Sequence, residues 1–256
     1  MPGDAAPSFV WIPDLGAPGA VLRLPAEPSH YLKRVCRVRP GELISLTDGD
    51  GGLAKGRIAS VGQRVEVEVE SVDRATRRRQ STVICGAPEG QRADWLIEKL
   101  SELGVAVLQP VDLERARWER SSSRTARWLR LALAALGQSR RRYLLEIREP
   151  MDLETVLGML PSGGPRWLAD PGGRPIWEIP PPAEPESVGF VGPSPGLSGE
   201  EGRLVGRAGF LPICLSDSRL RTETAAMLWA GWVGGWYLRK GVFPEVRPEP
   251  PDAPLA

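Results

Sequence analysis

The stretch Leu215-Ser216-Asp217-Ser218-Arg219-Leu220-Arg221-Thr222-Glu223-Thr224-Ala225 joins a short strand predicted at 211–215 to an apolar helix predicted at 225–238. Thr222 or Thr224 is suited to cap that helix, and the carboxylate of Glu223 suits its positive end. Arg219 and Arg221 suit the same place poorly, because the helix dipole disfavours cations there. This conflict indicates a role elsewhere for one arginine, although a solvated arginine fits the sequence equally well.

Upstream of this stretch, strands and helices alternate from residue 81 onward. The apolar periodicity predicts strands at 82–86, 105–111, 166–168 and 188–191, and helices at 92–103, 123–138 and 151–160. Gly104 is well placed to end the first helix. The alternation implies a mostly parallel sheet, so the expected class is α/β. In the last helix, Trp229, Trp232 and Trp236 form one stripe, which fits either the core or a subunit interface.

A loop with several glycines follows the strand at 188–191 and reads Gly192-Pro193-Ser194-Pro195-Gly196-Leu197-Ser198-Gly199-Glu200. Ser198 and Glu201 have the spacing of a capping box at the start of a helix. The loop matches neither the dinucleotide-binding nor the P-loop glycine pattern. Loops at the carboxyl ends of parallel strands bind ligands in α/β proteins, so this loop is a candidate site. A plain strand-to-helix turn is the alternative.

The first 70 or so residues are typical of β structure. Strands are predicted at 21–24, 42–47, 53–60 and 64–72, with a hairpin turn at Asp48-Gly49-Asp50-Gly51-Gly52. In the last of these, valines alternate with glutamates, which indicates one buried and one exposed face. The pattern favours a small barrel or sandwich. The charged segment 73–80 has no periodicity and marks a domain boundary.

The composition of the 256 residues excludes several classes of protein. Hydrophobic residues make up 41% and charged residues 25%, which is typical of a globular protein, and the net charge is +1. No apolar run is long enough for a transmembrane helix, and the N-terminus lacks a signal-peptide pattern. Cys36, Cys85 and Cys214 form no CxxC pair, and His30 is the single histidine. We therefore expect no metal site, no disulfide framework and no membrane, and a cytoplasmic location.

Cations gather in four clusters, at 31–39, 77–79, 115–130 and 140–142. In a chain of net charge +1, this clustering suggests a surface that faces phosphates, and arginine suits bidentate contact with phosphate. Solvated helix faces are the usual alternative for any one cluster. Trp118 and Trp128 lie among arginines, where stacking on bases is a further possibility.

These segments together resemble the ribosomal small subunit methyltransferase E family, the 16S rRNA (uracil-N3)-methyltransferases. The resemblance runs from about His30 to Trp236. Its motifs are the N-terminal signature at 30–42, the K-x-x-E-L-G helix at 99–104, the E-Q-S-x-R segment around 138–141, and the LG-x-R-I-L-R-x-E-T-A motif at 215–225. The last of these is the most specific.

The resemblance implies a PUA-like RNA-binding β-barrel over residues 1–76. A SPOUT α/β methyltransferase domain with a C-terminal trefoil knot would follow over residues 77–244. The proline-rich residues 245–256 would form a disordered tail. The family is a homodimer that binds S-adenosylmethionine in the knot, so the tryptophan stripe would suit a dimer contact. The implied reaction is methylation of N3 of a uridine in 16S rRNA, either free or in the small ribosomal subunit.

The resemblance also assigns residues. The cofactor pocket would be built from the backbone around Leu168, Gly192, Gly196, Leu215 and Leu220. Arg221 would orient the target uridine or stabilise its negative charge as N3 loses a proton, and Glu223 is a candidate base. Phosphates of the rRNA would contact five arginines, namely Arg34, Arg37, Arg39, Arg140 and Arg141.

Departures from the family pattern concentrate near the cofactor. The family's G-P-E-G-G loop is Gly192-Pro193-Ser194-Pro195-Gly196 here, Gly137 replaces a glutamate, and Asp217 replaces a glycine. Pro195 has no N–H and a fixed φ, which would matter if the cofactor needs that amide. Asp217 would either contact a cationic group of the cofactor or be solvated. A non-catalytic RNA-binding or ribosome-assembly protein on the same fold is therefore the alternative, and the arginine clusters disfavour a small-molecule enzyme.

Overall fold

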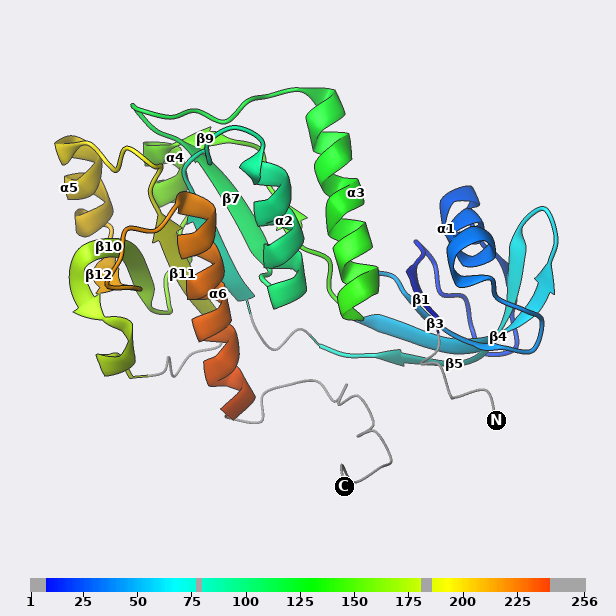
Figure 1. The fold of residues 1–256 in the computed structure, drawn as a ribbon. Helices are drawn as coiled ribbons and strands as arrows, with labels where there is room; N and C mark the ends of the chain where they lie inside the picture. The colour runs from blue at the N-terminus through cyan, green and yellow to red at the C-terminus, as the bar shows by residue number, and fades with distance from the viewer. Residues whose placement is uncertain (1–7, 77–79, 181–185, 240–256) are drawn as a thin grey trace, which may run out of the picture.

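A computed structural model describes residues 8–76, 80–180 and 186–239, which form a β-rich unit and an α/β unit (Figure 1). The tail predicted at 245–256 lies outside the described residues. In the first unit, the strands β1 (Ser8–Trp11), β2 (Val21–Arg23), β3 (Leu43–Thr47), β4 (Gly52–Val61) and β5 (Val65–Arg74) form one sheet in the order β1-β3-β4-β5-β2. The short helix α1 (Ala26–Tyr31) continues into a π-helical turn, Leu32–Cys36.

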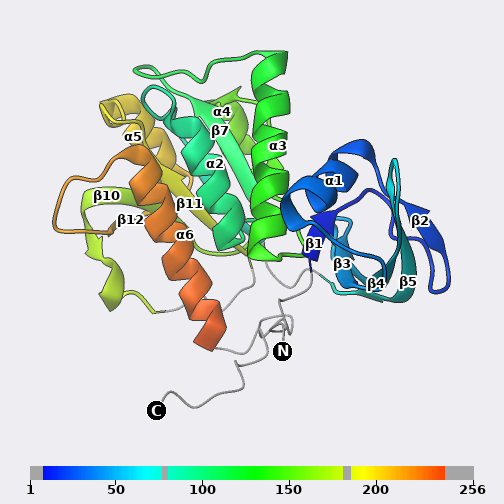
Figure 2. The same cartoon turned by 45° about the vertical axis from the view of Figure 1, so that its right-hand side comes forward.

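The first sheet curls on itself (Figure 2). Apolar and polar residues alternate along its strands, so one face of the sheet is buried in a single core. Val65, Val67 and Val69 of β5 are fully buried, while the glutamates between them face outward. Their valine side chains pack with Ile44 and Ile58 from the neighbouring strands. The predicted strands are therefore confirmed. Strand β1 was not predicted, and it pairs parallel with β3.

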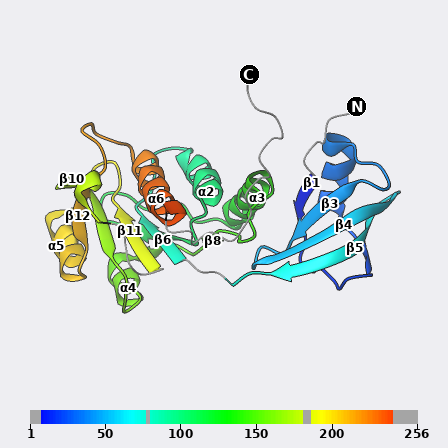
Figure 3. The same ribbon diagram turned by 90° about the horizontal axis from the view of Figure 1, so that it is seen from below.

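The second unit is a seven-stranded sheet in the order β12-β10-β11-β6-β7-β8, with β9 beside β7. Every strand pair in it is parallel, which confirms the α/β prediction. Its strands are β6 (Gln80–Cys85), β7 (Val107–Asp112), β8 (Glu146–Ile147), β9 (Met151–Asp152), β10 (Arg166–Pro175), β11 (Glu186–Val191) and β12 (Leu211–Cys214). The helices α2 (Arg92–Leu103), α3 (Ser122–Ser139) and α6 (Thr222–Arg239) cover one face, and α4 (Leu153–Gly158) and α5 (Gly199–Arg207) cover the other (Figure 3).

Helix α6 packs closely on the sheet, and its tryptophans show how. A Cβ at Gly189 of β11 would lie 2.4 Å from the ring of Trp229, so only glycine permits this approach. Trp229 is 1% exposed, and both Trp229 and Trp232 pack against Trp167 of β10. The core interpretation is therefore confirmed for Trp229, while the side chain of Trp236 lies outside the described residues.

Some predicted elements differ in extent from the observed ones. The helix predicted at 151–160 is a two-residue strand followed by α4, which starts after Asp152 caps it through the N–H of Thr155. The strand predicted at 166–168 continues to Pro175, past a register shift between Ala169 and Arg174. Helix α6 begins at Thr222, before the predicted start at 225. Within the described residues, no helix is long and apolar enough to cross a bilayer.

The two units meet where the predicted hairpin turn at 48–52 pairs with residues 142–144. The N–H of Gly51 donates to the Arg142 carbonyl at 2.9 Å, and the N–H of Leu144 donates to the Gly49 carbonyl at 2.8 Å. The Tyr143 hydroxyl donates to the carbonyl of Ala75. This turn therefore joins the barrel to the segment that follows α3.

Candidate functional site

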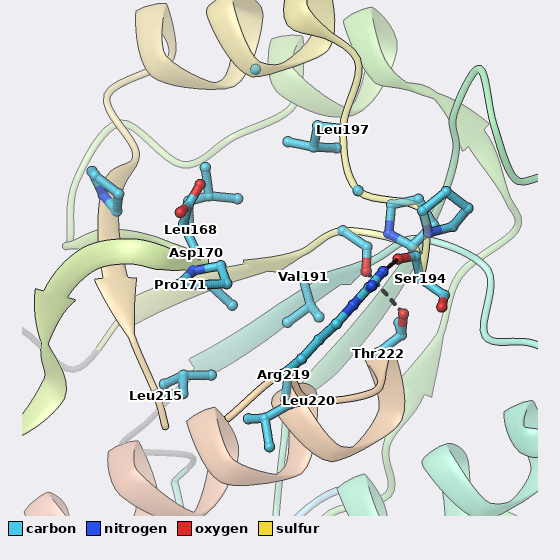
Figure 4. A pocket seen from close by; sticks show the side chains of 18 of the residues that line it. Leu168, Asp170, Pro171, Val191, Ser194, Leu197, Leu215, Arg219, Leu220 and Thr222 are labelled. Carbon is cyan, nitrogen blue, oxygen red and sulfur yellow. Dashed lines mark hydrogen bonds between the residues drawn. The ribbon is translucent and has the colours of Figure 1, made fainter. Parts of the chain in front are cut away.

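A cavity of about 650 Å³ opens at the carboxyl ends of β10, β11 and β12 (Figure 4). Pockets of roughly 300–1,000 Å³ are typical of small-molecule sites. Its apolar lining comes from Leu168 within β10, from Val191 at the end of β11, and from Leu197, Leu215 and Leu220 in the loops that follow the strands. The cavity therefore lies where parallel sheets bind ligands.

The loop 192–198 forms one wall of the cavity. Its turn is closed by the N–H of Gly196, which donates to the Pro193 carbonyl at 2.8 Å, and Gly196 has a φ of +80° that suits glycine. Ser198 and Glu201 form the predicted capping box at the start of α5. The buried Glu201 carboxylate also accepts the N–H of Glu114 at 2.7 Å. The loop is thus fixed at its end by a group that also holds the 113–117 segment.

Two arginines and a threonine from other segments of the chain donate hydrogen bonds to carbonyls of this loop. Arg219 donates to the Ser194 carbonyl at 2.8 Å, and Arg115 donates to the Pro195 carbonyl at 3.2 Å. The Thr222 hydroxyl donates to the Gly192 carbonyl at 3.0 Å, and Thr222 is the first residue of α6 rather than the cap residue before it, so it is not the predicted cap. Figure 4 shows the Arg219 side chain reaching across to Ser194. Together these bonds connect the 192–196 loop to the 215–225 stretch.

The residues predicted around the cofactor come together in this cavity. Its lining includes all five of them: Leu168, Gly192, Gly196, Leu215 and Leu220. Arg221 lies between the lining residues Leu220 and Thr222, but its own side chain is exposed and lies outside the lining. Asp217 is exposed and also outside the lining.

Glu223 faces away from the cavity lining. Its carboxylate is 2% exposed and accepts the Arg92 guanidinium at 2.7 Å, which joins the first turn of α6 to the first residue of α2. Burial and the nearby carboxylate of Glu223 raise the pKa of the Cys85 thiol. The structure therefore places Glu223 in an ion pair between two helices.

The five arginines predicted to contact RNA fall into two groups. Arg34, Arg37, Arg39 and Arg140 are exposed. Arg141 is half-buried, and its Nε donates to the Glu102 carbonyl at the end of α2. Burial lowers the pKa of Arg141. A Cβ at Gly104 would lie 2.0 Å from its guanidinium, so this glycine leaves room for the arginine as well as ending α2.

Two functional candidates were missed from the sequence. Asp170 is the one carboxylate that lines the cavity, and its Oδ1 accepts the N–H of Gly172 at 2.7 Å. It sits in the part of β10 beyond the predicted strand, so its position could not be inferred from the strand pattern. Arg115 was noted only as part of a basic cluster, and its contact with Pro195 joins segments 80 residues apart.

Comparison with known proteins gives a consistent family. A family model described as an RNA methyltransferase domain matches residues 75–234, and one described as an RNA methyltransferase PUA domain matches residues 24–70. Ribosomal RNA small subunit methyltransferase E from Synechocystis sp. is 27% identical over 216 residues, covering 80% of this chain and 70% of the relative. Its counterpart from Mycobacterium bovis is 27% identical over 228 residues, covering 84% and 87%.

Solved structures of similar proteins extend the comparison to three dimensions. Ribosomal RNA small subunit methyltransferase E from Neisseria gonorrhoeae, bound to S-adenosyl methionine, has a TM-score of 0.79 at 27% identity and covers 93% of this chain and 98% of that one. A methyltransferase from Legionella pneumophila, also with bound cofactor, has a TM-score of 0.79 at 27% identity and covers 90% and 98%. Both span the barrel and the α/β unit.

Proposed function

Because the chain belongs to the RNA methyltransferase family, we propose that it uses S-adenosylmethionine to methylate N3 of a uridine in 16S rRNA. The observation that carries this proposal is the cavity at the carboxyl ends of β10–β12, which unites the residues of two separate family motifs. A protein with this substrate would work in the cytoplasm.

The cavity fits the cofactor in size and chemistry. Its volume of about 650 Å³ lies within the range for nucleoside-sized ligands, and leucine and valine side chains offer an apolar floor for a base. Backbone groups of the loop 192–197 provide polar contacts, and the Asp170 carboxylate can accept hydrogen bonds from an amino group. We therefore assign Leu168, Gly192, Gly196, Leu215 and Leu220 to cofactor binding, with Asp170 added.

We assign the substrate uridine to Arg221, at the edge of this cavity. The cofactor supplies a methyl group activated by a sulfonium centre. Arg221 would hold the uracil against that position and stabilise its negative charge as N3 loses its proton. Positioning contributes much of the rate in such a transfer, and the connection of Thr222 to Gly192 fixes the backbone that carries Arg221.

Glu223 was a candidate base, and its placement supports another role. A carboxylate that is 2% exposed, paired with Arg92 and outside the cavity lining is not placed to contact a base held in the cavity. We propose that Glu223 is a positioning residue, which holds the first turn of α6 and so the backbone of Arg221. In the same way, Arg141 would brace α2, while Arg34, Arg37, Arg39 and Arg140 contact rRNA phosphates.

We propose two further features, a trefoil knot and a homodimer. The trefoil knot would be formed by the segments around the cavity, and the protein would act as a homodimer, as in the family that it resembles. A non-catalytic RNA-binding protein is the second candidate function, favoured by Pro195, which offers no N–H in the cofactor loop.

Calorimetric titration with S-adenosylmethionine separates the two candidates. A micromolar dissociation constant, on the order of −8 kcal/mol, followed by methyl transfer to 16S rRNA would support the enzyme. The modified nucleotide is then identified by mass spectrometry of the rRNA digest. An absence of binding, both alone and with rRNA present, would contradict the enzyme and favour the RNA-binding protein.

A further inference from the structure

Arg64 is unusual among the half-buried arginines of the described residues. The others, at positions 92, 124, 141, 142, 148 and 166, each donate a hydrogen bond or ion pair from the guanidinium. The Arg64 guanidinium has no such partner within the described part of the chain. A charged group partly withdrawn from water without a partner favours binding of an oppositely charged ligand.

Arg64 lines a cavity of about 380 Å³ at one end of the barrel, together with Arg23, Leu24, Pro25 and Gln63. The lining holds two cations and no acid. Glu66 of β5 lies opposite Arg23 in the register of the two strands and forms no ion pair with it. Its Oε2 instead accepts the Ser60 hydroxyl at 2.8 Å. The Arg23 side chain likewise has no partner among the described residues, so both guanidinium groups are available.

The backbone around this cavity is held in place from within. The buried Ser29 hydroxyl donates to the Leu24 carbonyl at 3.1 Å and accepts the N–H of Val65 at 3.1 Å, which fixes the two segments that carry Arg23 and Arg64. Lys33 donates to the carbonyls of Gly62 and Gln63 and fixes the turn between β4 and β5. The backbone segments that carry the two arginines are therefore held together by the buried Ser29 and by Lys33.

We propose that Arg23 and Arg64 form a phosphate-binding site, which holds a backbone phosphate of the substrate RNA. The proposal deepens the proposed function, on which the identity of the RNA rests. The turn between β4 and β5, which leads into Arg64, lies at the end of the barrel away from the α/β unit (Figure 1). Strand β4 spans ten residues between the two ends, or up to ~30 Å. An RNA that contacts both this site and the cavity of the α/β unit must therefore be long or folded.

The test measures binding of a 16S rRNA transcript to Arg23→Gln, Arg64→Gln and the double variant over a series of salt concentrations. We expect affinity to fall by several-fold to about tenfold, and the salt slope to decrease by roughly one per lost contact. Arg57→Gln is the matched control. It removes the same charge from the same barrel, but Arg57 is already paired with Glu70 at 2.7 Å, so little change is expected.

Wild-type affinity and slope in the double variant would overturn the proposal, as would an equal loss in the control. A thermal shift with inorganic phosphate that is lost in Arg64→Gln, with RNA binding unchanged, would also overturn it in favour of a free-anion site. Because the test measures RNA binding and not methyl transfer, failure of the phosphate-site proposal can be distinguished from failure of the proposed function. If RNA binding depends on these arginines but no methyl group is transferred, the proposed enzymatic function is contradicted and the phosphate site still stands.

Discussion

Arg221 is an exposed side chain between two residues that line the cavity, and from that position we propose that it contacts the substrate rather than the cofactor. We predict that Arg221→Gln lowers kcat for rRNA methylation by roughly 100-fold, because it removes a cation placed where negative charge develops. Affinity for S-adenosylmethionine is expected to stay within about twofold. Single-turnover methylation and calorimetry measure the two effects.

Arg203→Gln is a suitable control for Arg221→Gln, since Arg203 is an exposed arginine of α5 without a side-chain partner among the described residues. Its turnover should match that of the wild type. Arg221→Lys should recover part of the lost rate, because it keeps the charge and loses the planar donor geometry. An unchanged kcat in Arg221→Gln would remove this residue from the reaction.

The pair of Arg92 and Glu223 permits a test of positioning against base catalysis. We predict that Arg92→Gln destabilises the protein by roughly 1–3 kcal/mol, because it leaves a buried carboxylate without its partner. The double variant Arg92→Gln with Glu223→Gln should regain part of that stability and part of kcat, since no buried charge remains. Urea unfolding and kcat of both single variants and the double variant give the coupling.

A base would behave differently in this cycle. If Glu223 accepted the N3 proton, Glu223→Gln would lose activity whatever residue stood at position 92, and the pH–rate profile would lose a limb. Recovery in the double variant, with the shape of the pH profile unchanged, is expected only for a positioning residue.

At the scale of elements, the loop 192–196 forms one wall of the cavity and carries Pro195. The turn is closed by Gly196, and Arg219 and Arg115 hold the carbonyls of Ser194 and Pro195. We predict that Pro195→Gly lowers the free energy of unfolding by roughly 0.4–1 kcal/mol, because the unfolded chain gains freedom. Affinity for S-adenosylmethionine should change by less than about threefold, as measured by calorimetry.

A large gain in affinity in Pro195→Gly would contradict this expectation. It would mean that the missing N–H, or a φ that proline cannot adopt, limits cofactor binding in the native chain. Ser194→Ala is the control in the same turn, since it keeps the Ser194 carbonyl that Arg219 contacts.

Sequence periodicity predicted most elements, because most of them bury one regular face. The capping box at Ser198 and the end of α2 at Gly104 follow from local rules, and both are observed. Strand β1 was missed because it is only four residues long and pairs with a strand 36 residues away. The start of α6 was misplaced because the first three residues of the helix are polar, so the apolar pattern begins only at Ala225.

The site was less predictable than the fold for a related reason. The five residues predicted to bind the cofactor belong to family motifs, and the topology of the sheet brings them to one cavity. The partners of Glu223 and Arg141 lie 131 and 39 residues away, so no local pattern shows that the first is ion-paired and the second half-buried. The sequence shows that these two residues are charged, but it does not show that they are buried, and their roles depend on that burial.

At the scale of the whole molecule, hydrogen bonds hold the barrel beside the α/β unit, and we expect recognition of the rRNA to depend on that placement. The turn at 48–52 supplies that connection through Gly51. Gly51 has a φ of +88°, and a Cβ there would lie 2.4 Å from the Ala75 carbonyl and 2.7 Å from the Tyr143 hydroxyl. Any side chain at this position must move the junction.

We predict that Gly51→Ala raises the KM for 16S rRNA and lowers stability by roughly 3 kcal/mol, since it combines backbone strain with the displaced junction. Gly19→Ala is the matched control, because Gly19 has a φ of +86° in the same barrel and nothing within 4 Å of its Cβ position. It should show the strain alone, of about 1 kcal/mol, with KM unchanged. Cofactor affinity should be unaffected in both, because the cavity belongs to the α/β unit. Equal KM values in the two variants would mean that the RNA is recognised without a fixed barrel, and the arginines of the barrel would then act only as a tether.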